Sequence, residues 1–235
     1  MSRERTDLQK TATSSEVDAF LRQVAATPRR PGTRGRLIFA MDATASRQPT
    51  WDQARQIQAA MFRETANLGG LSVQLCFYRG VLEFEASPWC AGADALRQRM
   101  SRVHCAAGLT QIKRVLRHAL AEHGRSRVNA LVFVGDCLEE NPDELAGLAG
   151  KLGLTGLPVF VFQEGRDPVA ERSFRQLARL SGGAYSPFDA SSPQTLRDLL
   201  SAVAVFAAGG RQALEQFGRQ RGGAALQLTH QIIGR

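Results

Sequence analysis

The chain has 235 residues, of which 43% are hydrophobic and 22% are charged. This length and composition fit one α/β domain with a sizeable core and short appendages. No apolar stretch approaches the length of a membrane span, and the N-terminus lacks the apolar core of a signal peptide. We therefore expect a cytoplasmic protein without a membrane segment.

The four cysteines have no zinc-type spacing, and disulfides are not expected in a reducing compartment.

The formal net charge is +8, and nearly all of the basic residues are arginine. Such a charge can indicate a nucleic acid or an acidic partner. However, the arginines are spread over every predicted helix, and no stacking aromatic residues accompany the places where they concentrate. Those places hold Arg29, Arg30, Arg34 and Arg36, and further on Arg211, Arg219 and Arg221. A basic nucleic-acid-binding adaptor is therefore an alternative and not the first expectation.

Three segments differ in composition along the chain. Residues 1–35 form a polar N-terminal segment with a predicted helix over 16–26, which follows a capping pattern at Ser15, and then a basic linker rich in Pro and Gly. Residues 36–208 carry alternating strand and helix patterns and form the main domain. Residues 209–235 contain repeated glycines and form a C-terminal tail that includes several arginines.

The main domain is predicted to alternate strands with helices. Strands are expected over 37–41, 71–78, 81–85, 128–134, 157–162 and 184–188, and helices over 51–67, 93–103, 110–123, 142–152, 168–180 and 193–208. Thr50 is expected to cap the first of these helices. A tight turn at Arg79-Gly80 joins the second and third strands into a hairpin. The fold class is therefore α/β, a Rossmann-like three-layer α/β/α arrangement whose central sheet is mostly parallel with one antiparallel edge strand.

Polar side chains follow the first predicted strand directly. Asp42, Thr44 and Ser46 form a D-x-T-x-S pattern after the apolar run 37–41. Alternate residues that leave an extended segment project the same way, so one carboxylate and two hydroxyls are expected to gather at the carboxyl edge of the sheet. Hard oxygen ligands of this kind suit Mg²⁺ or Mn²⁺ rather than zinc or copper. A simple polar turn that caps the next helix would give the same pattern.

Two further polar residues are predicted at the same edge. Thr110 stands at the mouth of a helix, and Asp136 follows the dense apolar strand over 128–134. In an open parallel sheet, ligands bind beyond the carboxyl ends of the strands. Asp42 and Asp136 end strands that this topology places side by side.

This ordered set resembles the von Willebrand factor A (vWA) family over roughly residues 36–208. The metal-ion-dependent adhesion site (MIDAS) of that family combines D-x-S-x-S with a threonine in a later loop and an aspartate at the end of the central strand. The matching residues here are Asp42, Thr44, Ser46, Thr110 and Asp136. The order of strands and helices is also similar to that family, including the hairpin after the first helix.

The resemblance implies that Thr44, Ser46 and Thr110 ligate the ion directly, while Asp42 and Asp136 act largely through water. Neutral hydroxyl ligands leave the cation most of its charge, which can then attract a carboxylate from a partner protein. The resemblance therefore implies a binding domain rather than an enzyme. It also suggests an intracellular bacterial member, a group whose proteins often act as adaptors in chaperone-linked, metal-insertion or stress-response assemblies.

Two positions depart from the pattern of that family. Thr44 replaces the commoner serine and keeps the hydroxyl, whereas Cys137 stands where a glycine usually follows the aspartate. Glu139 and Glu140 come next, and they either add negative potential beside the site or are ordinary solvated loop acids.

An enzyme is the other alternative. Asp42, Lys113 and Cys137 occur in the order of the catalytic residues of isochorismatase-like cysteine hydrolases, in which a carboxylate and a lysine lie near a nucleophilic thiol. Against this, Lys113 lies one helical turn past Thr110, where it can point to solvent.

Overall fold

The computed structural model describes residues 34–188 and 193–221. Its strands are Gly35–Asp42 (β1), Leu71–Arg79 (β2), Glu83–Ala86 (β3), Ala130–Gly135 (β4), Val159–Glu164 (β5) and Tyr185–Phe188 (β6). Its helices are Ala45–Arg47 (η1), Gln48–Ile57 (α2), Ala59–Thr65 (α3), Ala66–Leu68 (η2), Ala93–Met100 (α4), Ile112–Arg125 (α5), Pro142–Thr155 (α6), Pro168–Ser181 (α7) and Pro193–Arg221 (α8). The helix expected over 16–26 and the end of the predicted tail lie outside the described residues.

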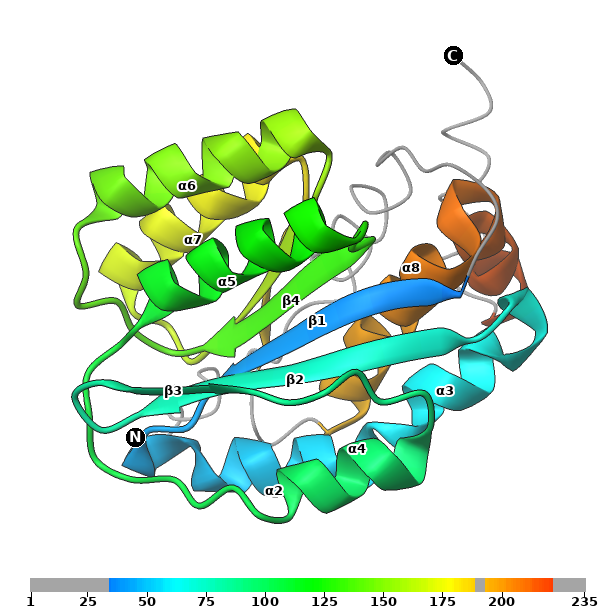
Figure 1. Cartoon of the computed structure of the whole chain (residues 1–235), viewed down its shortest axis with the longest axis horizontal. Helices are drawn as coiled ribbons and strands as arrows, with labels where there is room; N and C mark the ends of the chain where they lie inside the picture. Colours follow the sequence, from blue (N-terminus) through cyan, green and yellow to red (C-terminus); the bar gives the residue numbers. More distant parts are fainter. Residues whose placement is uncertain (1–33, 189–192, 222–235) are drawn as a thin grey trace, which may run out of the picture.

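The strands form one sheet of order β3-β2-β1-β4-β5-β6. All neighbouring pairs are parallel except β2 with β3, which is antiparallel at the edge. This confirms the predicted fold class. Since β1 and β4 are neighbours, the chain segments that follow them start side by side at the same edge of the sheet (Figure 1).

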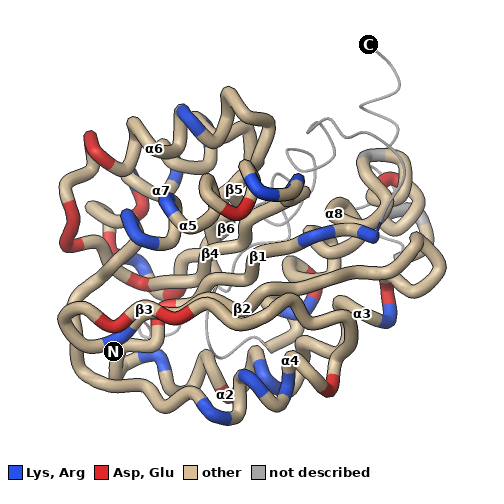
Figure 2. The backbone as a smooth tube through the Cα atoms, in the orientation of Figure 1, with Lys and Arg blue, Asp and Glu red and all other residues tan. Residues whose placement is uncertain are grey.

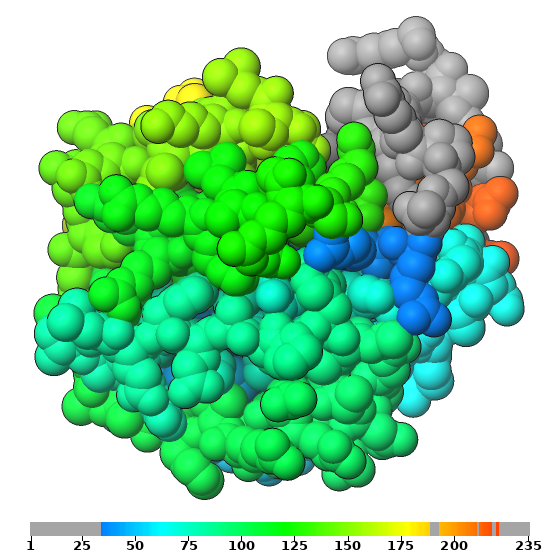
Figure 3. All heavy atoms as spheres, in the orientation of Figure 1, coloured from blue at the N-terminus to red at the C-terminus, as the bar shows by residue number. Residues whose placement is uncertain are grey.

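Helices cover both faces of the sheet because the strands are apolar on both sides. In β1, Leu37, Phe39 and Met41 pack into one core cluster with α2, α3, α4 and α8, whereas Ile38 and Ala40 pack into a second cluster with α5, α6 and α7. The two layers of helices lie on opposite sides of the sheet in Figure 1. In the space-filling view, α5 and α6 cover the upper part of this face, and β1 reaches the surface mainly near its amino end (Figure 3).

The region predicted as one helix over 51–67 is divided. The first helix, α2, starts earlier, at Gln48, and α3 follows after Gln58. Between them the Met61 amide donates to the Gln58 carbonyl at 3.1 Å, a hydrogen bond over three residues that is typical of a 3₁₀ turn. The expected helix cap at Thr50 is wrong. Thr50 lies within α2 and not before its first residue, and its hydroxyl donates to Glu164 at the end of β5.

The last predicted helix, over 193–208, ends close to the expected residue. The segment labelled α8 runs on to Arg221, but its backbone is non-helical at Gly210, where φ is 74°, and a second helix follows this kink. A positive φ is costly for most residues but not for glycine, so Gly210 permits the change of direction. Ala213 and Leu214 beyond the turn are buried against the domain.

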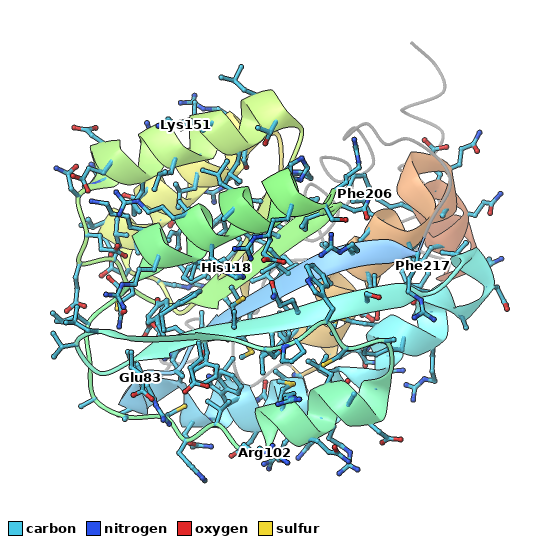
Figure 4. The ribbon with its side chains drawn as sticks, in the orientation of Figure 1. Glu83, Arg102, His118, Lys151, Phe206 and Phe217 are labelled. Atoms are coloured by element: carbon cyan, nitrogen blue, oxygen red, sulfur yellow. The ribbon has the colours of Figure 1, made fainter. Side chains whose placement is uncertain are left out.

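The histidines offer no metal pair at the positions that the structure describes. His118 of α5 lies over the sheet and shares a hydrogen bond of 2.9 Å with the side chain of Gln74 in β2 (Figure 4). His123 bonds to the backbone of Val128.

No helix within residues 34–188 and 193–221 is long and apolar enough to cross a membrane.

Candidate functional site

Three neighbouring parallel strands end in carboxylates at one edge of the sheet. Asp42 is the last residue of β1, Asp136 follows β4, and Glu164 is the last residue of β5. The register places Gly135 opposite Gln163. The residues that follow in each strand, Asp136 and Glu164, are therefore level with each other, beside the end of β1.

Asp42 is almost fully buried, with 1% of its surface exposed. Its Oδ1 accepts a hydrogen bond of 2.7 Å from the Thr44 amide, and its Oδ2 accepts one of 3.1 Å from the Tyr78 hydroxyl. The indole of Trp51 donates to the Asp42 carbonyl at 2.8 Å. Burial raises the pKa of Asp42, and the nearby charge of Asp136 raises it further, while the hydrogen bonds from Thr44 and Tyr78 oppose the shift.

Asp136 uses its two oxygens differently. Its Oδ2 accepts a hydrogen bond of 3.4 Å from Ser46 and lies 3.0 Å from a guanidinium nitrogen of Arg47. Its Oδ1 is buried and has no hydrogen-bond partner among residues 34–188 and 193–221. A buried carboxylate oxygen without a partner is costly, so this atom is a ready acceptor for a cation or a bound water.

Thr110 is tied to the loop that follows β4. Its amide donates to Glu139 at 2.8 Å, and its hydroxyl accepts from the Glu139 amide at 3.0 Å. Glu140 accepts from the amides of Ile112 and Lys113, at the N-terminus of α5. Glu139 and Glu140 are therefore not free loop acids, because they fasten the Thr110 loop to the segment that carries Asp136.

The structure brings the predicted ligand residues onto three adjoining loops. The Thr44 amide donates to Asp42, and the Ser46 hydroxyl donates to Asp136. The Thr110 hydroxyl accepts from the amide of Glu139, in the loop that follows Asp136. Ligand atoms of Asp42, Asp136 and Cys137 lie within 4.8 Å of one another. The carboxylate and hydroxyl oxygens, together with the unpaired Asp136 Oδ1, fit a hard divalent cation. Thr44 and Ser46 reach this place because the chain continues directly from β1 into η1.

Two residues at this edge were not expected from the sequence. Arg47 has 8% of its surface exposed and forms ion pairs with Asp136 and Glu164. Glu164 also accepts a hydrogen bond from Thr50. The signals for them were weak: Arg47 follows the D-x-T-x-S pattern directly, and Glu164 lies two residues beyond a predicted strand.

Of the three residues of the hydrolase alternative, Asp42 and Cys137 have ligand atoms within 4.8 Å of each other, whereas Lys113 has another partner. Lys113 Nζ pairs with Glu144 on α6. Burial raises the pKa of the Cys137 thiol to about 12, with further contributions from the negative charges of Asp136, Asp42 and Glu139. A nucleophilic cysteine requires the opposite shift.

Comparison with known proteins identifies the fold. No protein-family model and no curated protein matches the sequence. Among solved structures, the SpRpn10 VWA domain superposes with a TM-score of 0.54 at 12% identity, over 72% of this chain and 94% of that one. This chain has the vWA fold.

Other solved vWA-like neighbours differ in their settings. An aerotolerance-related membrane protein from Bacteroides fragilis NCTC 9343 superposes with a TM-score of 0.55 at 15% identity, over 72% of this chain and 98% of that one. Proximal thread matrix protein 1 from the mussel byssus, described with a zinc-occupied MIDAS motif, gives 0.56 at 11% identity, over 73% of this chain and 46% of that one. At these identities the likeness shows the fold alone.

Basic and acidic residues are distributed differently over this chain. Lys and Arg positions are spread over helices of both layers, as Figure 2 shows for α2, α4, α5 and α6, rather than gathered on one face. The acidic residues Asp42, Asp136 and Glu164 instead converge on one edge. This edge is therefore rich in acidic groups, despite the basic net charge.

The raised pKa of Asp42 predicts a pH-dependent difference between the wild type and Asp42→Asn in EDTA. Because the folded state holds the proton more tightly than the unfolded state, the wild type loses stability as pH rises from the unfolded pKa through the raised folded pKa. Asparagine keeps an acceptor for Thr44 but does not ionise. Urea unfolding at about pH 4, near the unfolded pKa, and at about pH 8 should show that the stability of Asp42→Asn relative to the wild type is greater at the higher pH. Parallel profiles would contradict the raised pKa.

The Cys137 thiol should react slowly with iodoacetamide in EDTA. With a pKa of about 12, we expect alkylation roughly 100-fold slower than that of glutathione at about pH 8, since the small thiolate fraction outweighs the higher nucleophilicity of each thiolate. Site-resolved mass spectrometry measures the rate, and the urea-unfolded chain is the matched control. A folded-state rate above that of the unfolded chain would favour the cysteine hydrolase instead.

Proposed function

We propose that this chain is a metal-dependent protein-binding domain and not an enzyme. A divalent cation, Mg²⁺ or Mn²⁺, would be held by the oxygen atoms of Asp42, Thr44, Ser46, Thr110 and Asp136. The observation that carries the proposal is a buried Asp136 oxygen that has no partner within the described part of the chain, on one of three adjoining loops that are hydrogen-bonded to one another. A water bound to the cation would supply the missing hydrogen bond.

The residues divide into two roles in this proposal. The hydroxyls of Thr44, Ser46 and Thr110 would hold the ion, and the carboxylates of Asp42 and Asp136 would act through water and set the local charge. When bound, the ion would supply a Lewis-acidic position for one outside oxygen ligand. Hydrogen bonds from the Thr44 amide and the Tyr78 hydroxyl fix Asp42 in its orientation, as expected for groups that support a metal site.

The partner in this proposal is a protein that presents an acidic residue. A carboxylate is the natural completing ligand for a hard cation that is held largely by neutral hydroxyls. We further propose a cytoplasmic setting, in which the chain acts as an adaptor in a chaperone-linked or stress-response assembly. The distributed arginines give less support to nucleic acid as the partner.

Millimolar Mg²⁺ or Mn²⁺ should raise the melting temperature of the wild type. Binding to the folded state alone stabilises it by about 2.7 kcal/mol when the ion is at 100 times its Kd. Asp42→Asn should lose most of this gain while still folding, because its side chain can retain both hydrogen bonds. Asp94→Asn, at a position 90% exposed on α4, is the matched control and should respond like the wild type. Equal responses of wild type and Asp42→Asn would contradict a metal site at Asp42.

A partner should bind in a chelator-sensitive manner. The wild-type chain immobilised as bait should release its partner from a native lysate in EDTA and bind it again when Mg²⁺ is restored. Asp42→Asn should bind little in either condition, and Asp94→Asn should behave as the wild type. Retention of the same partner in EDTA would contradict ion-bridged recognition.

A further inference from the structure

Arg47 occupies an unusual position for an arginine beside a cation site. Its Nη2 lies 3.0 Å from Asp136 Oδ2, its Nη1 pairs with Glu164, and its Nε donates to Ser46 Oγ at 3.4 Å. The residue is nearly buried. The guanidinium therefore contacts two of the groups proposed to hold the metal, Ser46 and Asp136, and also the carboxylate that ends the next strand.

The charges at this edge do not balance without a further cation. The strand ends contribute the carboxylates of Asp42, Asp136 and Glu164, and Arg47 is the cation paired with two of them. The group as a whole is left doubly negative when all three acids are ionised. A divalent cation would complete the balance if it took Asp42 and Asp136 and left Arg47 to Glu164.

We propose that Arg47 is an internal competitor of the divalent cation for Asp136. Without the ion, its guanidinium bridges Asp136 and Glu164. When Asp136 holds the ion, repulsion between the two positive charges leaves Arg47 with Glu164 alone. The bridge thus lowers the affinity for the ion and keeps the empty site ordered. This inference rests on the proposed function, because it sets the metal affinity of that same site.

Glu164 makes the competition reversible. It is anchored from a second side by the hydroxyl of Thr50, so it stays in place as a partner for Arg47 whichever way Asp136 is occupied. A buried guanidinium left without a partner would be strongly unfavourable. Glu164 therefore allows Arg47 to release Asp136 at a lower energetic cost.

Titration calorimetry with Mn²⁺ alone tests the competition. Arg47→Gln should bind Mn²⁺ at least about tenfold more tightly than the wild type, because Asp136 is released from the bridge. Arg47→Lys keeps the charge but lacks the planar fork that reaches two carboxylates, so it should also bind more tightly than the wild type. Arg55→Gln on α2, whose side chain is 41% exposed and pairs with Asp52, is the control and should match the wild type.

Two results would overturn the competition. Binding by Arg47→Gln that is equal to or weaker than the wild type would show that Arg47 does not oppose the ion. Binding by Arg47→Lys equal to the wild type, with Arg47→Gln tighter, would show an effect of net charge without a contested contact. If Arg47→Gln fails to fold by circular dichroism, Glu164→Gln decides. It should bind Mn²⁺ more weakly, because Arg47 then holds Asp136 alone, and unchanged or tighter binding would overturn the inference.

The same titrations separate this inference from the proposed function. Binding by the wild type without a gain in the Arg47 variants overturns the competition and leaves the metal site standing. Binding by the Arg47 variants with none by the wild type upholds the competition and overturns the proposed function of the unaltered chain. Absence of Mn²⁺ binding in every variant overturns both.

Discussion

The concentration of buried negative charge at one edge of the sheet is the constraint on which the site depends. Parallel strands β1, β4 and β5 all end there, so their terminal carboxylates are brought together by the backbone register. Removing an ionised carboxylate from water costs several kcal/mol unless a cation or hydrogen bonds compensate it. Arg47 and the donors Thr44, Ser46 and Tyr78 provide part of this compensation.

The surrounding fold holds the loops of this edge in fixed positions. Glu139 and Glu140 join the N-terminus of α5 to the loop after β4, and Trp51 of α2 bonds to the backbone at the end of β1. These contacts come from both helical layers. A site that is held from both faces of the sheet can keep its oxygen atoms in place before a ligand arrives, which lowers the ordering cost of binding.

The fold and the positions of Asp42 and Asp136 at the edge of the sheet could be predicted from the sequence, because they follow from local patterns. Apolar runs and their spacing define the strands, and residues that directly follow a strand, such as Asp42 and Asp136, must lie at its end. The position of Arg47 was not predictable, because in an arginine-rich chain its side chain resembles any surface guanidinium. Its burial depends on the pairing of β4 with β5, which brings Glu164 level with Asp136. The second helix, after the kink at Gly210, was not predicted either, because it depends on the packing of Ala213 and Leu214 against the domain.

The most direct test of the metal site is an anomalous diffraction map from crystals grown with Mn²⁺. The expected result is a single strong peak at the hydroxyls of Thr44, Ser46 and Thr110, within reach of Asp42 and Asp136 through bound water, with the Arg47 guanidinium on Glu164 alone. A map with no peak at this edge, and with Arg47 still bridging Asp136 and Glu164, would contradict it.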